Sequence, residues 1–111
     1  MDILSQFPGK YLKAADFPAP RSLTINRVHN EMVGQEKDSK PVIYFDGEDR
    51  GIVLNKTNAN TLAQLHGRDT TKWSGKQVEC YATKVQFGID MVDSIRMQEP
   101  KPAFEDADIG F

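Results

Sequence analysis

The chain has 111 residues and a mass of 12.5 kDa, which corresponds to one domain with a modest hydrophobic core. Its 14 basic and 16 acidic residues give a formal net charge of -2, within the range of ordinary soluble folds. The single cysteine excludes an internal disulfide, no apolar run is long enough to span a membrane, and the first residues lack the pattern of a signal peptide. We therefore expect a cytoplasmic protein.

The chain begins with a proline-containing lead-in and continues into segments with strand patterns. In the lead-in, residues 1–20, we expect four side chains to pack on the body: Leu12, Ala14, Ala15 and Phe17. Strands are predicted over residues 22–33, 42–45, 52–55, 77–85 and 89–97, from period-two alternation or β-branched and aromatic content. The second and third form a hairpin around the turn DGEDRG.

Two of the predicted strands contain a slip in apolar phase, and one helix separates the third and fourth strands. The slip between Ile25 and Val28 indicates a β-bulge or sharp bend, and a second slip follows Val92. The helical face consists of Ala59, Leu62, Ala63 and Leu65 or His66. Thr57 and Asn58 are N-cap candidates, and Gly67 is a natural C-terminal stop.

Five strands with one helix between the third and fourth is the element order of the OB-fold, an all-β, five-stranded Greek-key barrel. A long, bent first strand is also expected in that fold. Another small barrel or an α+β sandwich could have the same order of elements. We divide the chain into the lead-in 1–20, an OB-fold domain 21–98 and an acidic tail 99–111.

Outward aromatic side chains are the first candidates for binding a single strand, because bases stack on them. Ile43 and Phe45 are predicted to face the core, which leaves Tyr44 and Val42 outside. Val78, Cys80 and Ala82 are likewise assigned to the core, so Tyr81 faces out, while Phe87 lies at a hairpin tip. Each of these aromatics could instead be a half-buried rim residue. Trp73 either plugs the barrel or stacks a base.

Basic and polar residues in loops and at strand ends complete the candidate nucleic-acid site, since phosphates need cations. These are Arg27, Arg50, Asn55, Lys56, Lys76 and Lys84. We find no zinc spacing among His29, His66 and Cys80, no calcium loop in residues 46–49 and no catalytic constellation. The sequence therefore predicts no metal, no cofactor and no enzyme activity.

The last ten residues carry three acids and no base, so the other 101 residues hold 14 bases and 13 acids. The ending FEDADIGF resembles the acidic tip of bacterial and phage single-stranded DNA-binding proteins, with matches at Asp106, Asp108, Ile109 and Phe111. Gly110 stands where the bacterial form has Pro, the acids are fewer, and the long Gly/Gln-rich linker is missing. The segments LNKTN (54–58) and WSGK (73–76) are also similar to small phage-encoded OB-fold proteins. A solubilising end without a partner is the alternative reading of the tail.

The resemblance implies a phage or prophage protein that binds single-stranded DNA without sequence preference in replication or recombination. It also implies that the tail recruits replication or recombination proteins. The alternatives are an OB-fold protein-interaction or virion module without nucleic-acid binding, and an RNA binder. The sequence predicts no membrane partner and leaves homo-oligomerisation open.

Overall fold

A computed structural model describes residues 10–33 and 38–100 of the chain. The strands are β1 (Arg21–Val33), β2 (Asp38–Phe45), β3 (Ile52–Val53), β4 (Gln77–Phe87) and β5 (Asp90–Gln98). One helix, α1 (Lys56–His66), lies between β3 and β4, and two short 3₁₀ turns, η2 (Ala14–Asp16) and η3 (Thr70–Lys72), precede β1 and β4. The order of elements predicted from the sequence is confirmed.

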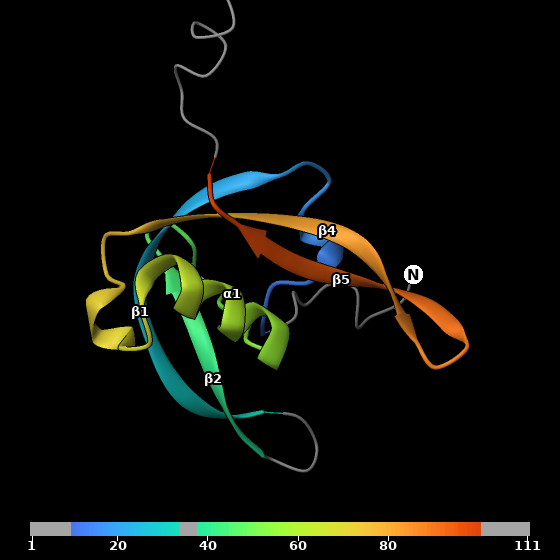
Figure 1. The fold of residues 1–111 in the computed structure, drawn as a ribbon, viewed down its shortest axis with the longest axis horizontal. Helices are drawn as coiled ribbons and strands as arrows, with labels where there is room; N and C mark the ends of the chain where they lie inside the picture. The colour runs from blue at the N-terminus through green and yellow to red at the C-terminus, as the bar shows by residue number, and fades with distance from the viewer. Residues whose placement is uncertain (1–9, 34–37, 101–111) are drawn as a thin grey trace, which may run out of the picture.

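The five strands form one antiparallel sheet in the order β3-β2-β1-β4-β5 (Figure 1). The sheet is not closed into a barrel, because β3 and β5 do not pair in the described part of the chain. β3 is only two residues long, and the chain next to it is bonded to the lead-in instead: the Leu12 N–H donates to the Gly51 carbonyl at 2.8 Å. The structure therefore shows an open, mostly β sheet with one helix.

The bulge predicted in the first strand is confirmed. Ile25 pairs with Phe45, whereas Arg27 pairs with Tyr44, so Asn26 is the extra residue. β1 curves strongly (Figure 1), which lets its first four residues pair with β4 and its later residues pair with β2. The β4–β5 register is unbroken, so the second phase slip does not mark a bulge. The slip arises because Val92 is exposed, where the hairpin extends beyond the core, whereas Ile95 is buried in the core.

The core lies inside the curved sheet and includes residues from the lead-in. Leu12 and Phe17 are buried there, as predicted, whereas Ala15 is exposed. Two predictions on the sheet were wrong: Val42 is fully buried and Ala82 is exposed. Val42 is covered because the chain passes so close at Gly51 that a Cβ there would lie 2.8 Å from Val42 Cγ1. Ala82 lies where β4 leaves the core.

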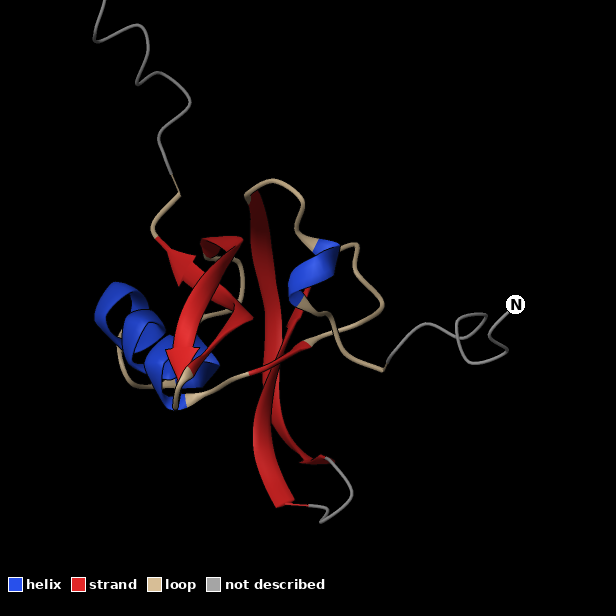
Figure 2. Ribbon diagram, turned by 90° about the vertical axis from the view of Figure 1, so that its right-hand side faces the viewer, coloured by secondary structure: helices blue, strands red, loops and turns tan. Residues whose placement is uncertain are grey.

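Helix α1 begins two to three residues earlier than predicted and packs against β5 (Figure 2). Asn55 is the N-cap, and its Oδ1 accepts the Asn58 N–H at 2.8 Å, so neither Thr57 nor Asn58 caps the helix. Asn58 is instead buried, and its Nδ2 donates to the Ile95 carbonyl at 2.9 Å. The helix ends at Gly67 as predicted, with φ +90°.

Candidate nucleic-acid interface

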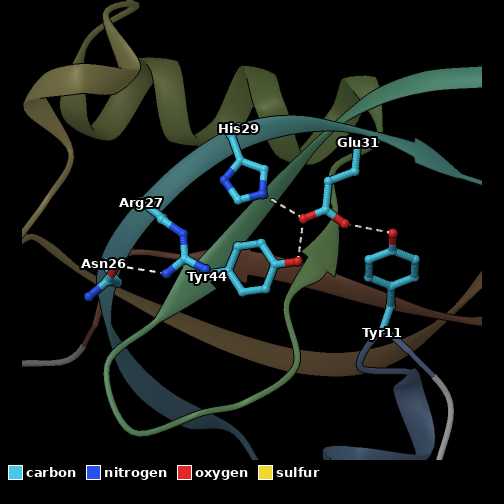
Figure 3. Close-up of polar contacts among 6 residues, drawn as sticks. All are labelled: Tyr11, Asn26, Arg27, His29, Glu31 and Tyr44. Carbon is cyan, nitrogen blue, oxygen red and sulfur yellow. Dashed lines mark hydrogen bonds and ion pairs between the residues drawn. The ribbon is translucent and has the colours of Figure 1, made fainter.

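A polar cluster covers the outer face of the β1–β2 pair (Figure 3). Arg27, His29 and Glu31 alternate along β1, so all three point to the face opposite the core. Tyr44 of β2 pairs with Arg27 and points to the same face, as predicted. Tyr11 of the lead-in reaches this cluster because it forms a β-bridge with Gly51, and the next residue, Leu12, donates its N–H to the Gly51 carbonyl. The cluster therefore joins three segments distant in sequence.

Glu31 is the acceptor at the centre of the cluster. Tyr11 Oη donates to Glu31 Oε1 at 2.8 Å, Tyr44 Oη donates to Oε2, and His29 Nε2 lies 2.6 Å from Oε2. The hydrogen bonds from Tyr44 and Tyr11 lower the pKa of Glu31 to about 2. The same bond to Glu31, together with burial, raises the pKa of Tyr44 to about 12. Glu31 therefore stays ionised and holds the Tyr44 ring in place.

Arg27 lies over the Tyr44 ring, with the guanidinium carbon 4.4 Å from the ring centroid. The His29 ring is 5.2 Å from that of Tyr44, tilted by 32°. Arg27 is exposed, donates to Asn26 Oδ1 at 3.1 Å, and makes no ion pair with any acid in the described residues. A planar cation stacked on a fixed aromatic can stack a base and also attract a phosphate.

Two further predicted residues have structural partners of their own. Arg50 Nη2 lies 3.2 Å from Asp16 Oδ1, an ion pair that ties the 46–51 turn to the lead-in. Asn55 caps α1. Lys56, the first residue of that helix, is exposed. Of these three, only Lys56 leaves its polar group free of a partner within the described chain.

The β4–β5 hairpin divides its predicted site residues between two faces. Tyr81 and Phe87 alternate onto one face, and Lys84 points to the other. Lys84 Nζ lies 2.8 Å from Asp93 Oδ1, and both side chains are exposed. Phe87 is 75% exposed, as its predicted position at the tip requires. The two predicted aromatics therefore share one face of the hairpin, whereas the predicted cation lies on the other.

Trp73 belongs to the core, as the plug interpretation of the sequence predicted. The residue is 3% exposed and its Nε1 donates to the Gly67 carbonyl at 2.9 Å. A ring buried in this way offers no face to a base, and the plug interpretation is the correct one. Lys76 next to it is exposed, and its carbonyl accepts the Ile25 N–H beside the bulge.

The predicted partner-binding residues Asp106, Asp108, Ile109 and Phe111 lie outside the described residues. The sequence reasoning missed Tyr11 and Glu31, and considered His29 only as a metal ligand. One signal was available: Arg27, His29 and Glu31 are polar at every second position directly after the bulge. Tyr11 had no such signal, because only tertiary contacts bring it there.

A cavity of about 500 Å³ lies in the gap between β3 and β5. Residues 12–15 of the lead-in, Ile52 and Val53 of β3, and residues 93–95 of β5 line it together with Asn55 and Asn58. The Asn58 Oδ1 is buried without a hydrogen-bond partner.

Across residues 10–33 and 38–100, no group of three or more His, Cys, Asp or Glu side chains is placed to hold a metal ion. No helix in those ranges is long and apolar enough to cross a membrane. No protein-family model, no curated protein and no solved structure is significantly similar to the chain.

Proposed function

We propose that the chain is a non-enzymatic, OB-fold-like protein that binds single-stranded DNA without sequence preference in the cytoplasm, in phage or prophage replication or recombination. The strand order and the place of the helix support this topology, because an OB-fold is a partly open five-stranded barrel. In that reading, the open gap between β3 and β5 is the unclosed side of the barrel. In OB-folds, the face of strands 2 and 3 is the surface that binds oligonucleotides.

The observation that carries the proposal is the Arg27–Tyr44 stack on the outer face of β2 and its neighbour β1. Non-specific binding of single strands needs aromatic or guanidinium planes for the bases and cations for the phosphates. Arg27 supplies a plane and a charge at one point, and Glu31 fixes the ring beneath it. Lys40 pairs with Glu31 across the strands, so a second cation lies at the end of the cluster.

The test is the affinity of the intact chain for fluorescent oligo-dT, measured by anisotropy over a range of salt concentrations. Tyr44→Ala should weaken binding by about 1–3 kcal/mol, the usual cost of losing one stacking plane. For wild type, log affinity should fall with log salt at about -0.7 per phosphate contact, with roughly three to five contacts. A salt slope near zero would contradict the proposal.

Arg27→Lys separates the two roles assigned to Arg27. Lysine keeps the charge but has no planar group to stack, so affinity should fall while the salt slope stays the same. Lys72→Ala is the matched control, because Lys72 is an exposed cation on η3, outside the proposed surface. If Arg27→Lys, Tyr44→Ala and Lys72→Ala all bind as wild type does, this face does not hold DNA. Duplex DNA and RNA of equal length distinguish the RNA-binding alternative.

The tail, residues 99–111, is proposed on sequence grounds to recruit replication or recombination proteins. Its acids would approach a basic surface, and Phe111 would fill an apolar slot. Deleting residues 104–111 should raise affinity for single strands at low salt, because a tethered acidic segment competes with phosphates. A deletion that leaves DNA affinity unchanged and still captures the same proteins would refute this role.

One observation favours the alternative of a protein-interaction module. Four large apolar side chains on the β4–β5 hairpin are exposed: Phe87, Ile89, Met91 and Val92. Exposed large apolar side chains that gather on one element often mark a protein contact. This alternative predicts no oligo-dT binding at any salt concentration.

A further inference from the structure

The β4–β5 hairpin runs beyond the rest of the sheet as a two-stranded ribbon (Figure 1). β1 pairs with β4 only from Gln77 to Cys80, so β4 has β5 as its single partner from Tyr81 onward. An isolated hairpin is only marginally stable in water. Of the five exposed large hydrophobic residues in the described chain, this ribbon and its turn carry all but Met32. Both features indicate a surface that another molecule covers.

The unbroken register determines which side chains share a face of the ribbon, because directly paired residues point the same way. The face opposite the core consists of four successive pairs, and we call it the outer ribbon face: Tyr81 with Arg96, Thr83 with Ser94, Val85 with Val92, and Phe87 with Asp90. The other face carries the ion pair between Lys84 and Asp93 and the side chain of Met91.

The two ends of the outer ribbon face carry opposite charges. Arg96 lies at one end, where its Nη1 donates to Ser94 Oγ at 3.0 Å and to the Ile95 carbonyl at 3.3 Å. Asp90 lies at the other end, about 20 Å along the strand at 3.3 Å per residue. Neither forms an ion pair with another described residue. Each end also carries an aromatic ring.

We propose that two copies of the chain dimerise through their outer ribbon faces, packed antiparallel across a two-fold axis. The axis passes between the Thr83–Ser94 and Val85–Val92 pairs. Arg96 then meets the partner's Asp90, and Tyr81 meets the partner's Phe87. Val85 and Val92 lie against the partner's Thr83 and Ser94. Such an interface is isologous, because one surface complements itself.

The physical gain comes from covering apolar side chains that water now surrounds. Phe87 and Val92 leave solvent, and each aromatic ring finds an aromatic partner. The alignment is set by charge: sliding one copy would separate Arg96 from the partner's Asp90, and packing the ribbons parallel would place like charges at the same end. The proposed DNA surface at Tyr44 lies on β1 and β2 and contributes no residue to this interface.

The test is the molar mass of the intact chain without DNA, measured by sedimentation equilibrium over increasing protein concentration. Wild type should rise from one chain mass toward two. Arg96→Glu alone and Asp90→Arg alone should each stay monomeric, because each places like charges together. The double variant should dimerise again, and an equimolar mixture of the two single variants should form a heterodimer. Met91→Ala, on the other face, should dimerise as wild type does.

A single-chain mass for wild type at the highest concentration would overturn the proposal, and so would a double variant that folds but does not re-form the dimer. If the chain is monomeric and Phe87→Ala weakens oligo-dT binding, the outer ribbon face holds bases instead of a second copy. Circular dichroism of every variant shows whether it is folded. Tyr44→Ala should still dimerise, so loss of DNA binding and loss of the dimer are separate results.

Discussion

Trp73 offers the most direct test of the core, through replacement by Phe. The indole is 3% exposed and donates its N–H to the Gly67 carbonyl at 2.9 Å. A hydrogen bond of this kind contributes about 0.5–1.5 kcal/mol to stability. We use the lower half of this range, because Gly67 is exposed and water can replace the indole as donor to its carbonyl. Full truncation of a buried Trp to Ala costs about 3–5 kcal/mol. Phe keeps most of the ring, so the cavity should cost about 1–2 kcal/mol.

Together these effects predict that Trp73→Phe lowers the free energy of unfolding by about 2 kcal/mol. For a domain of this size, that corresponds to a fall in Tm of about 8–16 °C. Urea and thermal unfolding followed by circular dichroism measure both quantities. Met32→Leu is the control, because Met32 is 59% exposed and its substitution should change stability by less than about 0.5 kcal/mol.

The result that would refute this reasoning is a Trp73→Phe variant with wild-type stability. If such a variant also bound oligo-dT more weakly, Trp73 would belong to the nucleic-acid surface after all. Where the variant is fully folded, its affinity for oligo-dT should instead equal that of wild type, because Trp73 is buried and lies outside the proposed DNA-binding surface. Stability and affinity together thus distinguish the two roles that the sequence left open for this residue.

Three further predictions concern single residues. The folded pKa of Glu31 is depressed to about 2. Its contribution to stability is therefore present above its unfolded-state pKa and is lost as the pH falls through its folded-state pKa. In urea titrations, the difference in unfolding free energy between wild type and Glu31→Gln should shrink as the pH is lowered. In that variant, NMR of labelled tyrosine should show the pKa of Tyr44 falling from about 12 toward its ordinary value, and an unmoved pKa would contradict the hydrogen bond. Asn55→Ala should lower the free energy of unfolding by about 1 kcal/mol through loss of the helix cap, whereas Asn60→Ala, an exposed change inside α1, should have little effect. Burial raises the pKa of the Cys80 thiol to about 12, so iodoacetamide should modify it only after denaturation, and rapid labelling of the native protein would show an open core.

Much of the architecture follows from local sequence patterns. Strand alternation, the change to a helical period and the stop at Gly67 all depend on neighbouring residues, and each was predicted. The bulge at Asn26 was visible as a phase slip for the same reason. Tyr44 faces away from the core because its neighbours Ile43 and Phe45 face in, a consequence of strand geometry alone.

Other features were decided by contacts between segments far apart in the chain. Val42 is buried because Gly51 lies against it, and the sheet stays open where Leu12 bonds to the Gly51 carbonyl. Asn58 does not cap the helix, because its side chain is buried and donates to the Ile95 carbonyl. The cluster at Glu31 needs Tyr11, which is 20 positions away in sequence. Periodicity in the sequence shows which face of a strand or helix a residue occupies. It does not show which distant segment covers that face, and burial and hydrogen bonding depend on that segment.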